Sequence, residues 1–166
     1  LRMKSIRVHG QAARYQHTEF GINGRLDTIQ AAILLEKLAI FPDEVERRAS
    51  VAARYDEYLS HLAQTPVIRS GNASVFAQYT IEVSNRDSVQ AALRERGVPT
   101  AVHYPVALHE QPVFKAFYSE SLSFPNAEAA ARRVLSLPMH PYLTTVDQDK
   151  IIGALREVLQ DEVVEA

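Results

Sequence analysis

The sequence contains no cysteine and no tryptophan, and only two of its 166 residues are methionine. The absence of cysteine excludes disulfide bonds, thiolate metal ligands and cysteine nucleophiles. No apolar run approaches the ~20 residues that a membrane-spanning helix needs. Neither sign of charge dominates, because 18 basic and 20 acidic residues are interspersed along the chain. This balance gives no electrostatic reason to expect a nucleic-acid partner, which favours a basic face.

The composition is typical of a soluble globular protein, with 46% hydrophobic and 23% charged residues. The length fits one domain, and the lack of cysteine fits a reducing cytoplasm. Leu1–Arg7 is basic but is followed by no apolar segment, so it is not a signal peptide. Because the sequence does not begin with methionine, we expect it to be part of a longer chain.

A glycine-rich turn followed by an amphipathic helix stands out at Gly21–Leu38. Apolar residues recur there at helical spacing and predict a helix over residues 26–40. The turn before the helix carries Asn23 and Arg25. An amide can donate to a phosphate oxygen, and a guanidinium can bind a carboxylate or phosphate with two parallel hydrogen bonds. A local cap of the helix is the alternative interpretation of the same two side chains.

The rest of the pattern predicts a second long helix and then a compact α+β unit. Pro42 should separate the two helices, because the residue before a proline avoids the helical region. We expect apolar surface of both helices to pack on protein outside this chain. The remaining expectations are irregular chain at 1–20, a helix at 43–63, strands at 75–83, 99–104 and 135–139, helices at 87–96, 125–134 and 144–159, a helical turn at 111–117, and a fraying tail at 161–166.

A second polar pair, His103 and Tyr104, lies at the end of an expected strand just before Pro105. Imidazole and phenol groups can both hydrogen-bond a polar ligand, although a half-buried aromatic pair is the alternative. No two histidines have the helical spacing of a zinc site, so we expect no metal. The chain also lacks a Gly-x-Ser-x-Gly nucleophile motif and a complete dinucleotide fingerprint.

Several of these segments belong to one set of linked motifs. The motifs are Gly21–Ala32, Arg48-x5-Arg54-Tyr55-x3-Leu59, His103–Phe114, Phe124-Pro125-x2-Glu128 and Leu135–Pro141. They resemble, in order and at plausible spacing, those of the DegT/StrS-type nucleotide-sugar aminotransferases, which use pyridoxal phosphate. Residues 7–11 also resemble the segment that follows the cofactor lysine in this family.

The resemblance implies an α/β fold class. The chain would be the C-terminal part of a pyridoxal-phosphate-dependent transferase type I fold, with two long helices followed by a small mixed sheet and flanking helices. Residues 1–40 would be a remnant of the large cofactor domain with its dimer-facing turn and helix. Residues 41–65 would form a connecting helix, and residues 66–166 a small α+β domain.

The resemblance also implies roles for the polar residues. Asn23 would contact the cofactor phosphate of a neighbouring subunit in a homodimer with shared active sites. Arg25, His103 and Tyr104 would bind substrate. The substrate would be a keto nucleotide-sugar, with a UDP-N-acetyl-3-keto-hexuronic acid as the nearest match, and glutamate would be the amino donor. Such enzymes serve bacterial surface polysaccharide synthesis, including O-antigen and lipopolysaccharide.

The sequence departs from the family at one point, which concerns the lysine that binds the cofactor covalently. None of the four lysines lies in the matching motif, so this residue would lie upstream of residue 1 and the chain itself would hold no catalytic residue. We therefore expect these 166 residues alone not to transaminate. Two alternatives stay open: a non-catalytic nucleotide-sugar-binding or oligomerisation module, and a dehydratase in which histidine replaces that lysine. The four lysines are Lys4, Lys37, Lys115 and Lys150.

Overall fold

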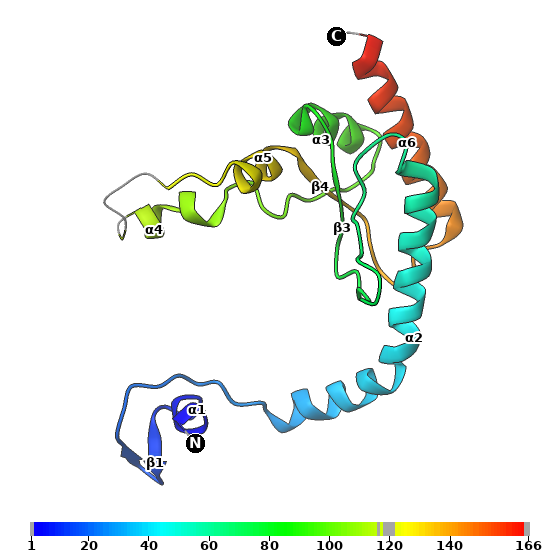
Figure 1. Ribbon diagram of the computed structural model, residues 1–166. Helices are drawn as coiled ribbons and strands as arrows, with labels where there is room; N and C mark the ends of the chain where they lie inside the picture. The colour runs from blue at the N-terminus through cyan, green and yellow to red at the C-terminus, as the bar shows by residue number, and fades with distance from the viewer. Residues whose placement is uncertain (1, 116, 118–121, 165–166) are drawn as a thin grey trace. The chain divides into compact units, whose positions relative to one another are not determined.

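The structure is a computed structural model that describes residues 2–115, 117 and 122–164 (Figure 1). It divides into an N-terminal unit, Leu1–Pro42, and a C-terminal unit, Asp43–Ala166, and each is described by itself. Among the described helices, none combines the length and the apolar character needed to cross a membrane.

The N-terminal unit begins with regular structure rather than irregular chain. Helix α1 spans Arg2–Ile6, and strands β1 (Gln11–Ala13) and β2 (Gln16–His17) pair in an antiparallel arrangement. The prediction of irregular chain for residues 1–20 was therefore wrong for residues 2–6, 11–13 and 16–17. Tyr15, in the reversal between the two strands, has a φ of 64°. Because a non-glycine residue rarely adopts this conformation, the sequence pattern does not predict a turn at this position.

The long helix α2 is continuous over Thr28–Leu59, with Pro42 inside it. The predicted separation into two helices at Pro42 was therefore wrong. Proline has no N–H to donate to the carbonyl of Leu38, which costs the helix one hydrogen bond. The residues on both sides include many strong helix formers, such as alanine, leucine, glutamate and arginine, which favour a helix despite that loss.

The sheet of the C-terminal unit is built on an antiparallel pair. Strand β3 (Tyr79–Glu82) pairs with β4 (Val134–Leu137), and isolated bridges add Ala101 beside β4 and Gln64 beside β3. All these pairings in the described residues are antiparallel, which corrects the expected mixed sheet. The strand predicted at 99–104 is reduced to the bridge at Ala101, because the prolines at its two ends have no N–H to give to a ladder.

The predicted helices of the C-terminal unit are present with small shifts of their ends. They are α3 (Arg86–Glu95), α5 (Pro125–Arg133) and α6 (Thr145–Val164). A turn of 3₁₀-helix, η1 (Leu108–Glu110), and the short α4 (Pro112–Lys115) lie in the loop before α5. Residues 116 and 165–166 of the predicted turn and tail lie outside the described residues.

Two helix boundaries follow the predicted signals, and one prediction fails. Gly97, with a φ of 74°, directly follows the C-cap of α3. The Asp147 N–H donates to Thr144 Oγ1 at 3.1 Å, which caps α6. However, α6 is helical to Val164, so the fraying predicted from Asp161 was wrong for residues 161–164.

One hydrophobic core connects the second half of α2 with β3, β4, α3 and α6. Gln148 of α6 donates to the Val51 carbonyl of α2 at 3.0 Å, so a buried polar contact also joins these two helices. The two helices lie side by side in Figure 1. The Tyr55 hydroxyl donates to the Pro138 carbonyl at 2.9 Å, and burial raises the pKa of Tyr55, which keeps it a donor. The fully buried large side chains are Tyr55, Tyr79, Leu59, Ile81, Leu93, Leu135, Leu155 and Val89.

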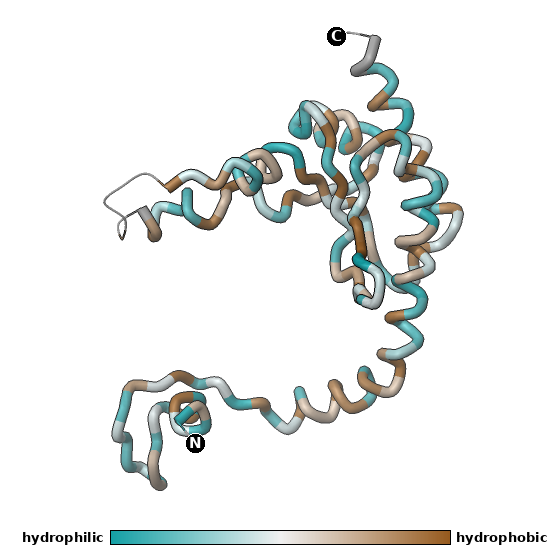
Figure 2. Tube along the Cα trace, viewed as in Figure 1, coloured by the Kyte–Doolittle hydropathy of each residue, from teal (hydrophilic) through white to brown (hydrophobic). Residues whose placement is uncertain are grey.

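The first half of α2 has an exposed apolar face instead. Brown apolar segments mark this part of the helix in Figure 2 as well as the core strands. Ile29 is 77% exposed, and Leu38 is 65% exposed. That this face packs on protein outside the chain stays a prediction.

We expect Val89→Ala to destabilise the C-terminal unit by about 2 kcal/mol, because it removes two buried methyl groups and leaves a cavity. The exposed Val146→Ala is the matched control and should change the unfolding free energy by less than about 0.5 kcal/mol. Both valines lie in helices, so the difference between the two variants reports mainly burial. Equal urea unfolding midpoints for the two variants would contradict this core assignment.

Candidate functional site

The glycine-rich turn is fixed to the segment that follows α1 by backbone hydrogen bonds. The Ile22 N–H donates to the Ile6 carbonyl at 2.8 Å, and the His9 N–H donates to the Ile22 carbonyl at 3.0 Å. The Gly24 N–H donates to the Arg7 carbonyl at 2.7 Å. These bonds give the turn a defined shape before α2 begins.

Two glycines allow this close backbone contact. A Cβ added to Gly21 would lie 2.1 Å from the Gly10 nitrogen, and one added to Gly10 would lie 1.7 Å from the Glu19 carbonyl oxygen. Neither distance can be relieved by rotating a side chain, because the atoms met are backbone atoms. Glycine is therefore required at both positions for the backbone to take this course.

Asn23 and Arg25 lie together on the surface of this turn. Arg25 Nε donates to Asn23 Oδ1 at 3.1 Å, and both residues are exposed. With its oxygen engaged, Asn23 has amide N–H groups to offer a ligand, and Arg25 has its two terminal nitrogens, since none of these groups is hydrogen-bonded to another described residue. The pair therefore presents several donors and one positive charge, which suits an anionic ligand.

Asn23 and Arg25 do not cap helix α2, so the alternative interpretation of these two side chains was wrong. The Ala31 N–H donates to the Asp27 carbonyl at 2.9 Å, which makes Asp27 the N-cap of α2. The Asp27 N–H donates to Gln30 Oε1 at 3.2 Å, the arrangement of one half of a capping box. Asn23 and Arg25 lie before this cap.

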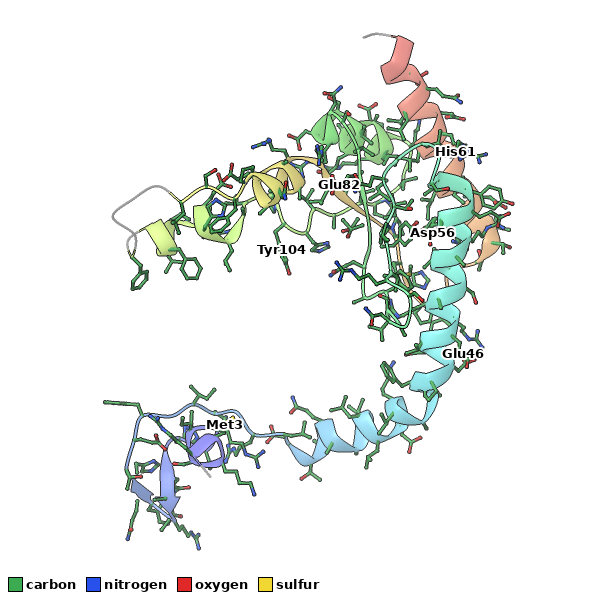
Figure 3. All side chains as sticks on the ribbon, in the orientation of Figure 1. Met3, Glu46, Asp56, His61, Glu82 and Tyr104 are labelled. Carbon is green, nitrogen blue, oxygen red and sulfur yellow. The ribbon has the colours of Figure 1, made fainter. Side chains whose placement is uncertain are left out.

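His103 and Tyr104 form a second polar pair, in the C-terminal unit. Their rings meet edge to face, with centroids 5.6 Å apart. His103 is half-buried, whereas the Tyr104 side chain is 72% exposed and projects away from the ribbon in Figure 3. His103 Nδ1 lies 3.0 Å from the hydroxyl oxygen of Ser136, which itself lies 2.8 Å from Thr80 Oγ1.

A half-buried polar contact between His109 and Glu128 ties the loop after Tyr104 to α5. His109 Nε2 lies 3.1 Å from Glu128 Oε1, which also accepts the Phe124 N–H at 2.7 Å and the Ser123 hydroxyl at 3.3 Å. The His109 ring packs edge to face on Phe124, with centroids 4.9 Å apart. The Phe124 N–H, with help from His109 and Ser123, holds the pKa of Glu128 below its usual range. These motif residues therefore serve to hold the loop.

Among the residues that the structure describes, no group of three or more histidine, aspartate or glutamate side chains is arranged to hold a metal ion. The polar pairs are instead suited to an organic anion that accepts hydrogen bonds.

Comparison with known proteins identifies the family to which a chain with these features belongs. Residues 1–156 match the DegT/DnrJ/EryC1/StrS aminotransferase family. The chain belongs to this family. It is 51% identical over 154 residues to a UDP-2-acetamido-2-deoxy-3-oxo-D-glucuronate aminotransferase of Pseudomonas aeruginosa, covering 92% of this chain and 42% of that protein. It is 37% identical over 161 residues to a dTDP-3-amino-3,4,6-trideoxy-alpha-D-glucose transaminase of Streptomyces venezuelae, covering 94% and 42% of the two chains.

Solved structures of the family share the fold. A DegT/DnrJ/EryC1/StrS aminotransferase from Brucella abortus superposes with a TM-score of 0.85 at 45% identity, covering 94% of this chain and 42% of that one. The NtdA structure from Bacillus subtilis with bound cofactor PMP gives a TM-score of 0.81 at 28% identity, with coverages of 94% and 38%. The predicted family and fold class are thus confirmed, with the corrections to the helix break and the strand directions given above. The chain spans less than half the length of these relatives.

The structure brings together the members of each predicted pair, Asn23 with Arg25 and His103 with Tyr104. Their roles toward cofactor and substrate stay predictions. Sequence reasoning did not single out Ser136 and Thr80, the hydroxyls behind His103. The only signal was a polar residue inside the apolar run of the strand, where Ser136 is 3% exposed.

We expect Gly21→Ala to loosen the turn, because its new methyl group would overlap the Gly10 backbone. Amide hydrogens of Ile22 and Gly24 should exchange with solvent at least about tenfold faster, which corresponds to about 1.4 kcal/mol of local stability. Gly153→Ala, in open space on α6, is the control and should leave these amides unchanged. Unchanged protection of Ile22 in Gly21→Ala would contradict the backbone contact.

We expect the Glu128 carboxylate to make stability depend on pH. Because its folded-state pKa is lowered, its contribution is complete above the ordinary glutamate pKa of about 4.3 and is lost as the pH falls through the folded value. The urea midpoint of Glu128→Gln should therefore lie below that of the unsubstituted protein at pH 6, and the difference should shrink toward pH 3. The exposed Glu46→Gln should show no such convergence, and a difference independent of pH for Glu128→Gln would refute this role.

Proposed function

We propose that the chain is the C-terminal region of a pyridoxal-phosphate-dependent aminotransferase that acts on a keto nucleotide-sugar. The observation that carries the proposal is the 51% identity over 154 residues to a UDP-2-acetamido-2-deoxy-3-oxo-D-glucuronate aminotransferase. The substrate is accordingly a UDP-N-acetyl-3-keto-hexuronic acid and the amino donor is glutamate. The enzyme works in the cytoplasm. Its product is used in the synthesis of bacterial surface polysaccharide, including O-antigen and lipopolysaccharide.

The residues of the turn fit a cofactor phosphate. Asn23 Oδ1 accepts from Arg25, so the amide N–H groups of Asn23 remain as neutral donors for phosphate oxygens. Pyridoxal phosphate, when bound, supplies an electron sink for proton transfer at the carbon that carries the amino group. Asn23 serves the cofactor of a neighbouring subunit, so the proposed assembly is a homodimer with shared active sites.

The other polar residues fit the substrate. The two terminal nitrogens of Arg25 have no hydrogen-bond partner among the described residues, and its planar fork matches a uronate carboxylate. His103 and Tyr104 offer an imidazole nitrogen and a phenol to the polar atoms of the sugar nucleotide. The chain's own part in the reaction is thus to bind and orient the substrate and to hold the cofactor phosphate.

The proposed domain organisation follows these roles. Residues 1–40 belong with the large cofactor domain, residues 41–65 connect, and residues 66–166 form the small α+β domain. The exposed apolar face on the first half of α2 supports this assignment, since apolar surface of this extent is normally covered in the folded enzyme.

A dTDP-sugar is the second candidate substrate. The 37% identity over 161 residues to the dTDP-3-amino-3,4,6-trideoxy-alpha-D-glucose transaminase supports it. The two candidates differ in the carboxylate, because the name of that relative describes a deoxysugar product without a uronic acid group. A test of Arg25 can therefore separate them.

We expect Arg25→Ala to weaken binding of UDP-N-acetylglucosaminuronic acid at least about tenfold, as for a lost bidentate charge-assisted hydrogen bond. Binding of UDP-N-acetylglucosamine, which has no carboxylate, should change much less. Isothermal titration calorimetry measures both affinities in the purified protein. Arg25→Lys keeps the charge but not the fork, and should restore little.

The exposed Arg14→Ala, in the same unit, is the control for a general loss of positive charge. An equal loss for both ligands in Arg25→Ala would argue against a carboxylate contact. Tighter binding of a dTDP-sugar than of either UDP-sugar would favour the second candidate.

A further inference from the structure

Three segments of the C-terminal unit meet in one row across its small sheet. Thr80 of β3 lies opposite Ser136 of β4, and Ala101 lies opposite Ser136 on the other side. The Ala101 N–H donates to the Ser136 carbonyl at 3.1 Å, and the Ser136 N–H donates to the Ala101 carbonyl at 2.7 Å. Residues directly opposite each other present their side chains to the same face, so Thr80 and Ser136 share one face. His103, two residues after Ala101, reaches the same face, because its Nδ1 lies 3.0 Å from Ser136 Oγ.

The side chains on this face form a short chain of hydrogen bonds. Thr80 Oγ1 lies 2.8 Å from Ser136 Oγ, which lies 3.0 Å from His103 Nδ1. Ser136 is 3% exposed, so water cannot readily replace the hydrogen-bond partners of its hydroxyl, and losing one of them costs free energy. The two backbone hydrogen bonds between Ser136 and Ala101 fix the position of this hydroxyl.

The hydrogen bonds from Thr80 through Ser136 to a neutral His103 ring can run in either of two directions. If Thr80 donates to Ser136 and Ser136 donates to Nδ1, both hydroxyl hydrogens are used and the imidazole hydrogen lies on Nε2. If Nδ1 donates to Ser136 and Ser136 donates to Thr80, the Thr80 hydrogen has no partner among the described residues. Because a half-buried hydroxyl favours a satisfied donor, the first arrangement is the better one.

We propose that Ser136, supported by Thr80, is a positioning residue that holds the His103 ring and keeps its hydrogen on Nε2. His103 then offers a neutral N–H donor to the substrate. This inference rests on the proposed function, in which His103 faces the nucleotide-sugar.

Such a donor has a consequence for specificity. It favours an oxygen that accepts, such as a carbonyl, carboxylate or phosphate oxygen, and it opposes an ammonium group at the same place, because two donors would face each other. Without Ser136, Nδ1 loses its partner and the ring becomes free to turn. Ser136 and Thr80 themselves touch no ligand in this proposal.

Nitrogen-15 NMR of the imidazole rings tests the proposal directly. Spectra are recorded on the purified, histidine-labelled protein at a pH of about 8.5, where imidazoles are neutral, and His103→Gln identifies the resonances of His103. The expected result is a protonated Nε2 and an unprotonated, hydrogen-bonded Nδ1. Ser136→Ala should move the Nδ1 resonance toward that of a free imidazole nitrogen, and the exposed Ser70→Ala should leave it unchanged.

A matched pair at Thr80 tests the second link. Thr80→Val keeps the shape but removes the hydroxyl, and should shift Nδ1 in the same direction by less, since Ser136 loses the donor that strengthens its own bond. Thr80→Ser keeps the hydroxyl and should resemble the unsubstituted protein. A protonated Nδ1, or an unchanged Nδ1 resonance in Ser136→Ala, would overturn the proposal. Equal shifts in the two Thr80 variants would refute the proposed role of the Thr80 hydroxyl in supporting Ser136.

Titration with UDP-N-acetylglucosaminuronic acid separates this proposal from the function on which it rests. Binding should shift the His103 Nε2 resonance, and Ser136→Ala should weaken binding about three- to tenfold, as for one lost hydrogen bond. If the ligand binds and leaves His103 unshifted, the substrate role of His103 fails and the donor proposal falls with it, whatever the ring spectra show. If His103 shifts but Ser136→Ala changes neither the spectra nor the affinity, only the positioning role is refuted.

Discussion

The two-sided pairing of β4 is the constraint on which the C-terminal unit depends. Ser136 exchanges backbone hydrogen bonds with Ala101 on one side and lies opposite Thr80 on the other. Its neighbours Leu135 and Leu137 are buried in the core that α2, α3 and α6 complete. Because the same short strand joins the core to the segment of His103, displacement of β4 would disturb the candidate site together with the fold.

The N-terminal unit depends on a different constraint, the close approach of two backbones. Gly10 and Gly21 leave no room for a Cβ, and their neighbours are hydrogen-bonded across the contact. The turn is therefore rigid before it enters α2, and the Asn23–Arg25 pair extends from a fixed base. In both units, the segment that carries the candidate polar pair is held in place by backbone pairing.

The proposed function gives the polar groups of both units a common role. The chain spans less than half the length of its relatives and presents hydrogen-bonding side chains in both of its units. In the proposed function, the part of this chain is recognition: an amide and a guanidinium bind anionic oxygens, and an imidazole and a phenol bind polar atoms of a sugar nucleotide. Its motif residues His109 and Glu128 contribute by holding the adjoining loop.

By itself, the sequence determined the family, the main helices and the two polar pairs, because linked motifs, helical periodicity and caps such as Thr144 are local signals. It could not determine that α2 continues through Pro42, since the loss of one hydrogen bond competes with the helix preference of the residues on both sides. Nor could it pair Ala101 with Ser136 or place Ser136 behind His103. Those contacts join residues more than thirty positions apart, and only the tertiary structure, by packing β4 between two segments, decided which hydroxyl meets which ring nitrogen.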